Sequence, residues 1–378
     1  NRDLFDKSLI EKSQIQVYQL GFFQSVSIQY TLPKEKVTSI PIQVTVKEAP
    51  RLTTKFGVGY GREDNFRVFT DITRLGFLGG TRRLNLYVKH SGLEPYNVNL
   101  KFTQPAFLSP RTSFQLESFV RKENEPGYRL QRIGTSPTLQ HIFSSKTNGY
   151  FGYNLEQIDQ NISEATIEKS FQRLAYNLYN KSSIKMGIIR DSSHPKFTPQ
   201  QGTFAALHYM FSGLGFESKY HFMKLILEFR HYMEIDNDVV FASKIKIGSM
   251  KPWKKGEAQI TPLEERFFAG GSMSVRGWAR SQLGPKNNEG DPVGGNSILE
   301  SSHELRFPIW GIISGATFLD IGNVWTKSLT YPFNDLYYAL GAGIRISTPI
   351  GPIRLDIGRP VFREVRDYQI HLNVGQAF

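Results

Sequence analysis

Apolar and polar side chains alternate with a period of two almost everywhere from residue 51 onward. In the last such segment one face contains Ile370, Leu372, Val374, Gln376 and Phe378, and the other contains Gln369, His371, Asn373 and Gly375. Successive side chains of a β-strand point to opposite faces, so this period predicts strands. Its repetition is typical of strands with one face toward lipid and one toward a polar lumen. The pattern therefore predicts an all-β, antiparallel transmembrane β-barrel.

Residues 50–378 provide room for about sixteen strands, at roughly 20 residues per strand and connection, and single-chain outer-membrane barrels have an even number. If the first strand runs outward, every second connection is predicted to be short and periplasmic. These connections are residues 75–81, 105–111, 144–147, 194–202, 235–238, 308–312 and 348–352. The longest connection, residues 249–296, falls on the other side and is predicted to be the sixth extracellular loop.

The first 49 residues have a different pattern. Apolar residues at mostly helical spacing predict a helix over residues 2–20, which Gly21 would end. Two strands are predicted next, over residues 24–32 and 40–47. Because Pro50 interrupts strand pairing, we expect an α+β domain in residues 1–49 and the barrel in residues 50–378. Residues 164–179 fit either a helix or a loop.

Composition narrows the class of protein further. No run of about 18 apolar residues occurs, which excludes a helical membrane span but not a barrel. The chain has no cysteine, which excludes disulfides, thiol catalysis and cysteine-ligated zinc. A formal charge of +12 would suggest nucleic acid as a partner. The basic residues are scattered singly among alternating strands, however, so we expect a polar lumen and cationic loops beside anionic lipopolysaccharide, and no nucleic acid.

The sixth loop contains the most informative motif, Val275-Arg276-Gly277-Trp278, in a stretch too rich in glycine and small residues for a helix. Alternate side chains of a strand point to the same face, an alternation that we call parity. Parity predicts that Glu304 and Asp320, in two downstream strands, point into the lumen. Arginine stays charged and can bind carboxylates bidentately. These residues suggest a clasp in which Arg276 binds Glu304 and Asp320.

A less specific interpretation of the same residues is available. Arg276 would then be a solvated loop residue, and the two acids would pair with Arg306 or Arg345 of the barrel wall. From the residues alone this second interpretation is favoured, and it is the family resemblance described next that favours the clasp.

These motifs resemble those of the bacterial surface antigen superfamily, outer-membrane barrels of the BamA and TamA kind. The resemblance is carried by residues 190–202, 266–271, 275–278, 318–322, 341–360 and 375–378, and it covers nearly the whole chain. It implies a sixth loop folded into the lumen, with the arginine tip docked on the wall. Residues 18–26 resemble the helix-to-strand corner of a polypeptide-transport-associated (POTRA) domain. The expected first strand of that domain is missing, so residues 1–49 are expected to be the C-terminal part of a periplasmic POTRA domain.

The first and last strands form a candidate lateral seam. Gly57, Gly59 and Gly61 are predicted to face inward, and interior glycines weaken a strand by roughly 0.5 to 1 kcal/mol each. Gly375 would kink the end of the last strand, whereas Phe378 is predicted to lie in its lipid-facing row. A barrel closed by two weakened strands would have a gate there. Close packing or barrel curvature explains the same glycines equally well.

Catalytic motifs are lacking in the sequence. It contains no Gly-x-Ser-x-Gly elbow, His-Glu-x-x-His site or P-loop. A hydrolase site assembled from distant strands would leave no local signature, but we expect a non-enzymatic protein with no catalytic residue, bound metal or cofactor.

The function that the resemblance implies is insertion of unfolded outer-membrane protein clients into the bacterial outer membrane, by lateral opening between the first and last strands. The expected partners are those clients, outer-membrane lipids and lipopolysaccharide, with periplasmic or lipoprotein accessory subunits left open. The alternative is a secretion channel of the two-partner translocator type, which would thread clients through the lumen. BamA-like and TamA-like roles are not distinguished by these residues.

Overall fold

The structure is a computed structural model that describes residues 5–32, 37–126, 128–161, 178–254, 261–348, 351–362 and 367–378. Of the undecided segment 164–179, residues 164–177 lie outside the described ranges, and residues 178 and 179 begin a strand. No helix in the described ranges is long and apolar enough to cross a membrane.

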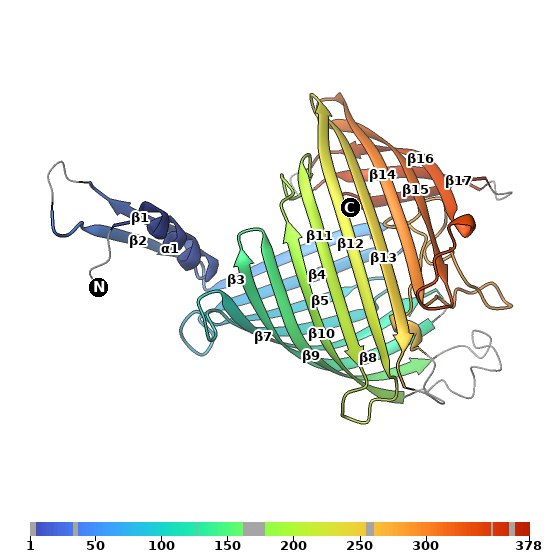
Figure 1. Cartoon of the computed structure of the whole chain (residues 1–378), viewed down its shortest axis with the longest axis horizontal. Helices are drawn as coiled ribbons and strands as arrows, with labels where there is room; N and C mark the ends of the chain where they lie inside the picture. Colours follow the sequence, from blue (N-terminus) through green and yellow to red (C-terminus); the bar gives the residue numbers. More distant parts are fainter. Residues whose placement is uncertain are drawn as a thin grey trace.

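A small α+β unit precedes the barrel and lies to one side of it (Figure 1). Helix α1 (Lys7–Gln19) is capped by the side chain of Asp6, which accepts a hydrogen bond from the backbone N–H of Ser8. Gly21, with φ +67°, directs the chain from the helix into β1 (Phe23–Tyr30). Strand β2 (Ile42–Glu48) pairs antiparallel with β1. The helix and both strands were predicted, with ends shifted by a few residues.

Sixteen strands then form one sheet in which every strand pairs antiparallel with its neighbours in the chain. The first eight are β3 (Leu52–Gly61), β4 (Asn65–Leu75), β5 (Arg83–His90), β6 (Tyr96–Gln104), β7 (Thr112–Glu125), β8 (Tyr128–Ser144), β9 (Thr147–Asn161) and β10 (Leu178–Asp191). The other eight are β11 (Gly202–Ser212), β12 (Phe222–Asp236), β13 (Val239–Pro252), β14 (Ser297–Trp310), β15 (Ile313–Trp325), β16 (Tyr337–Ile346), β17 (Ile353–Val361) and β18 (Gln369–Val374). The predicted all-β fold and strand number are confirmed.

Burial alternates along the strands as the sequence period predicts. In β14, Glu300, Ser302 and Glu304 are buried, while the intervening side chains are more exposed. On β3, Phe56 and Val58 are each 78% exposed on the outer face. Apolar side chains on the outside and polar ones inside are the arrangement of a barrel surrounded by lipid.

The short connections fall where they were predicted. The gaps between β4 and β5, β6 and β7, β8 and β9, β10 and β11, β12 and β13, β14 and β15, and β16 and β17 all coincide with the predicted turns. Because the strands alternate in direction, these turns share the end of the barrel where β3 begins, next to the α+β unit. The segment between β13 and β14 therefore emerges at the opposite end.

The prediction that Phe378 lies in the lipid-facing row is wrong. Strand β18 ends at Val374, and Gly375 has φ +99°, which breaks the two-residue period. The chain then turns inward, so Phe378 is only 6% exposed and its ring lies 6.4 Å from that of buried Tyr232. The guanidinium of Arg306 lies 5.2 Å from the ring centroid of Phe378. The C-terminus accordingly lies within the outline of the barrel in Figure 1.

Candidate functional site

Loop six, the segment between β13 and β14, folds back into the lumen as expected from the resemblance. Its described part, residues 261–296, starts with the short 3-10 helix η3 (Leu263–Glu265). Isolated bridges between Phe267 and Gly295 and between Ala269 and Leu283 hold the two arms of the loop together. Val275, at the tip, is 1% exposed. The loop therefore forms part of the packed interior of the barrel.

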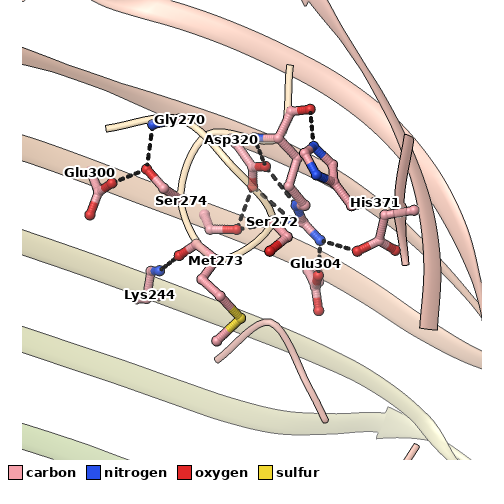
Figure 2. A network of polar contacts seen from close by, with 12 residues as sticks. Lys244, Gly270, Ser272, Met273, Ser274, Glu300, Glu304, Asp320 and His371 are labelled. Carbon is pink, nitrogen blue, oxygen red and sulfur yellow. Dashed lines mark hydrogen bonds and ion pairs between the residues drawn. The ribbon is translucent and has the colours of Figure 1, made fainter. Parts of the chain in front are cut away.

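Arg276 at the loop tip is surrounded by three carboxylates. Its Nε lies 2.7 Å from Asp320 on β15, and its Nη1 lies 2.5 Å from Glu304 on β14 and 3.4 Å from Asp356 on β17. The Arg276 side chain is 1% exposed and all three acids are fully buried. Figure 2 shows Glu304 and Asp320 converging on this point. The structure thus brings the three predicted clasp residues together and adds Asp356.

Two of the acids that hold Arg276, Glu304 and Asp356, also pair with the barrel-wall arginines Arg306, Arg345 and Arg354. Glu304 lies 2.8 Å from Arg306, and Asp356 lies 2.7 Å from Arg354. Of the less specific interpretation, only the pairing of Glu304 with Arg306 and Arg345 is found. Arg276 is buried rather than solvated, and in the described ranges Asp320 pairs with neither wall arginine. Burial opposes the charge of Arg276, but the carboxylates of Asp320 and Glu304 outweigh it and raise the pKa of Arg276 above its ordinary value.

Three inward positions of β15 each accommodate part of the loop tip. The ring of Phe318 lies 3.4 Å from the guanidinium carbon of Arg276, a cation–π contact. Asp320 binds the guanidinium itself. At Gly322, an added Cβ would lie 3.0 Å from the side chain of Val275, so the glycine leaves room for that residue. The alternation of β15 thus explains why an aromatic, an acid and a glycine occur at every second position.

The remaining two residues of the motif pack on β16 and β17. An added Cβ at Gly277 would lie 2.7 Å from the Cβ of Ala339 and 3.0 Å from the backbone nitrogen of Pro360, so only glycine fits this approach. Trp278 contacts Tyr337 edge-to-face, with ring centroids 5.4 Å apart. Every residue of the motif therefore packs against the wall formed by β15, β16 and β17.

A second charged cluster, which was not predicted, anchors the base of the loop on another part of the wall. Lys181 on β10 is fully buried and lies 3.0 Å from Glu264 and 2.6 Å from Glu265, both in η3. Lys224 on β12 lies 3.1 Å from Glu265, and Glu156 on β9 completes the cluster 3.3 Å from Lys181. Loop six is thus held by ion pairs at both its base and its tip.

The first and last barrel strands share no backbone ladder among the residues that the structure describes; the sheet begins at β18 and ends at β3. A side chain crosses this seam instead, because Arg62 donates to the carbonyl oxygen of Ile370 at 3.2 Å. Strand β18 is also short, with only six residues. The predicted seam therefore coincides with the interruption in the sheet.

The seam glycines face inward, as parity predicted, but the structure gives them a packing role. An added Cβ at Gly57 would lie 2.0 Å from the ring of Phe69, and one at Gly59 would lie 2.7 Å from Nε of Arg67. A Cβ at Gly61 would meet Asp64 at 2.6 Å. Both large side chains come from β4, so the glycines make space for the neighbouring strand. This observation favours the close-packing interpretation.

Several residues of the site were missed by the sequence argument: Asp356, Lys181, Glu265, Glu63 and His371. Parity placed Asp356 inward, because the apolar residues of its segment alternate with Arg354, Asp356 and Gly358. That signal would have been sufficient to include Asp356 among the predicted clasp residues. The same alternation placed His371 on the polar face of the last strand, but gave no indication of its partner Glu63. Lys181, Glu265 and Glu63 had no local signal, because their partners lie far away in the sequence.

A family model described as the Omp85 superfamily domain matches residues 77–378. BamA of Nitratidesulfovibrio vulgaris, an outer membrane protein assembly factor, is 23% identical over 100% of this chain and 48% of its own length. The chloroplastic outer envelope protein 80 of Arabidopsis thaliana is 30% identical over 29% of this chain and 15% of its own length. The chain thus spans about half the length of that BamA relative.

Solved structures show the same fold. BamA from Haemophilus ducreyi lacking POTRA domains 1–3 has a TM-score of 0.80 at 20% identity, over 98% of this chain and 78% of that one. CdiB from Acinetobacter baumannii has a TM-score of 0.62 at 13% identity, over 99% of this chain and 69% of that one. The family model covers most of the chain, and the predicted resemblance is confirmed. The chain therefore belongs to the Omp85 superfamily and is an outer-membrane β-barrel of the BamA and TamA kind.

Proposed function

We propose that this chain is the membrane-embedded part of an outer-membrane protein assembly factor, which inserts clients by lateral opening between β3 and β18. The observation that supports this function best is the seam, where the described residues of β3 and β18 lack the backbone ladder found between all other neighbouring strands of the sheet. Separating these two strands breaks few backbone hydrogen bonds. Opening elsewhere would break a complete ladder.

The chemistry of an open seam suits strand addition. Unpaired N–H and C=O groups on an exposed edge bind an incoming strand through main-chain hydrogen bonds. Backbone groups in lipid must all be paired, so a client gains free energy as its strands form. Client folding itself would drive insertion, and no catalytic residue, cofactor or nucleotide is required.

The domain assignment is part of this proposal. Residues 1–49 would be the C-terminal part of a periplasmic POTRA domain that delivers unfolded clients, and residues 50–378 would be the barrel. The described α1, β1 and β2 have the helix-then-hairpin order that such a domain ends with. Outer-membrane lipids and lipopolysaccharide would surround the barrel, and accessory subunits would bind the periplasmic part.

A disulfide across the seam tests lateral opening, and the cysteine-free chain gives it a clean background. An added Cβ at Gly61 would lie 3.8 Å from Oδ1 of Asn373, so Gly61→Cys with Asn373→Cys is the first pair to try. The control pair, Ile188→Cys with Leu207→Cys, joins residues directly opposite each other on β10 and β11. The seam bridge should abolish client assembly, reductant should restore it, and the control bridge should do neither.

A secretion channel is the second candidate function. Its support is the similarity to CdiB and the position of loop six, which fills part of the lumen and would have to move before a client could thread through. Full client handling with a fully formed seam bridge would exclude lateral opening and favour this channel.

A further inference from the structure

We propose that Glu63 and His371 form a seam latch, which holds β3 and β18 together only while the tip of loop six is docked. This inference rests on the proposed lateral opening and names residues that would control it. Glu63 lies in the turn between β3 and β4, and His371 lies in β18. Nδ1 of His371 is 3.5 Å from Oε1 of Glu63, and both side chains are largely buried. The pair therefore joins two edges that share no ladder.

The loop tip supplies the other contacts of both latch residues. The backbone N–H of Ser272 donates to Oε1 of Glu63 at 2.7 Å, and Nη1 of Arg280 lies 3.4 Å from Oε2. Nε2 of His371 lies 3.0 Å from the carbonyl oxygen of Arg276. Figure 2 shows His371 beside the clasp, on the side opposite Glu300. The segment that docks Arg276 thus also contacts both halves of the latch.

The hydrogen-bond chemistry of His371 makes the arrangement specific. Both of its ring nitrogens face acceptors, a carboxylate and a carbonyl oxygen. The ring therefore has an acceptor within reach of each nitrogen, whichever of them carries the N–H. Burial alone would raise the pKa of Glu63, but hydrogen bonds from His371 and Ser272 and the charge of Arg280 lower it to about 2. Glu63 is therefore ionised at neutral pH, and its carboxylate can only accept hydrogen bonds.

Undocking of loop six would remove most of this support. Glu63 would lose the Ser272 N–H and the charge of Arg280, and His371 would lose its carbonyl acceptor. Among the described residues, the polar contacts left across the seam would be that between His371 and Glu63 at 3.5 Å and the exposed hydrogen bond from Arg62 to Ile370. Polar contacts that water reaches contribute little to stability. The docked loop would therefore determine whether the seam stays closed.

Spin-label distances across the seam test the latch without any client. Labels at Val58→Cys and Ile370→Cys occupy exposed outer positions on β3 and β18, in an otherwise cysteine-free chain in lipid nanodiscs. Glu63→Gln should add a population at longer distance. The matched control is Asp64→Asn in the same turn, since Asp64 pairs with Arg67 of the adjoining β4 at 3.3 Å and not across the seam. The control should keep the wild-type distribution.

A double mutant tests the coupling between loop and seam. Arg276→Ala should broaden the seam distances as Glu63→Gln does, and the two together should add little, because undocking of the loop tip already separates Glu63 from Ser272 and Arg280. A wild-type distribution in Glu63→Gln, or additive effects in the double mutant, would overturn the latch. Heat-modifiable gel mobility confirms that each barrel is folded. If Glu63→Gln does not fold, His371→Gln, which retains one donor group, is judged by the same criteria.

The outcome is separate from that of the proposed function. The spin-label distances are measured without clients, so the latch is tested by the geometry of the seam alone. Full assembly activity with a bridged seam, together with a broadened seam in Glu63→Gln, would refute lateral opening and leave the latch intact. A bridge that blocks assembly, together with an unchanged seam in Glu63→Gln, would refute the latch only.

Discussion

Asp320 receives three hydrogen bonds from Arg276, through the backbone N–H, Nε and Nη2, at 3.1, 2.7 and 2.8 Å. Within the described ranges no other cation pairs with Asp320, whereas Glu304 and Asp356 also pair with arginines of the wall. The three acids of the clasp are therefore unequal. Asp320 alone depends on the loop for its counter-charge.

Arg276→Ala should leave Asp320 as a buried, unpaired carboxylate and cost on the order of 3 kcal/mol. Adding Asp320→Asn removes that charge and should recover part of the loss. Heat-modifiable gel mobility, measured over a temperature series, reports barrel stability. If Arg276→Ala behaves as wild type while Asp320→Ala and Glu304→Ala do not, the clasp has no role.

Gly277→Ala should displace the loop tip, because the new methyl group would lie 2.7 Å from Ala339 and 3.0 Å from backbone of β17. Gly290→Ala is a control in the same loop, with φ +87° but open space around it, so it adds backbone strain of about 1 to 2 kcal/mol without a clash. Protease cleavage within loop six should increase for the first variant. Equal cleavage in both would show that the close approach at Gly277 is unimportant.

Lys181→Met should loosen the base of the loop, since among the described residues it leaves Glu264 without its lysine and Glu265 with Lys224 as its one remaining cation. Removing one partner of a buried ion pair costs on the order of 3 kcal/mol. Lys185→Met, on the same strand, is the control, because its ion pair is with Glu156 of the wall at 3.9 Å. Thermal unfolding in nanodiscs distinguishes the two. A smaller effect at Lys181 than at Lys185 would contradict the anchor.

Low pH should weaken the contacts of Glu63. Its pKa is lowered from 4.5 to about 2, so its stabilising contribution is complete above pH 4.5 and is lost as the pH falls toward 2. The difference in thermal midpoint between wild type and Glu63→Gln should therefore shrink over that interval. Asp64→Asn serves again as the comparison. A difference that stays constant from pH 6 to pH 2.5 would rule out this titration.

Most of the fold could be predicted from the sequence, because the alternation of apolar and polar residues within each barrel strand shows which side chains face lipid and which face the lumen. Parity alone placed Glu304 and Asp320 in the lumen, and the resemblance selected Arg276 as their partner. The two-residue alternation gave the wrong orientation for Phe378, because Gly375, a single residue with a left-handed backbone conformation, ends the alternation before it. A period of two carries no information beyond the last residue that is still in the strand.

Other parts of the site were beyond the reach of any local pattern. Glu63 and His371 are separated by almost the whole barrel in sequence and meet only because the sheet curves back on itself. The anchor of Lys181 on Glu265 depends on the path of loop six through the lumen. The packing role of Gly57 required the position of Phe69 on the neighbouring strand. Such contacts become visible only in three dimensions.

The polar contacts of Glu63, Arg280 and Arg62 lie at the seam, where the described residues of β3 and β18 form no backbone ladder. They also differ from a ladder in how they respond to dissolved ions. Glu63 is 18% and Arg280 is 39% exposed, and the bond from Arg62 to Ile370 is exposed as well. Dissolved ions screen such charges over about 8 Å at physiological ionic strength, but leave buried backbone hydrogen bonds nearly unaffected. We therefore expect the resting width of the seam to vary with the salt concentration outside the cell, which would make the medium itself one of the factors that set how readily the barrel opens.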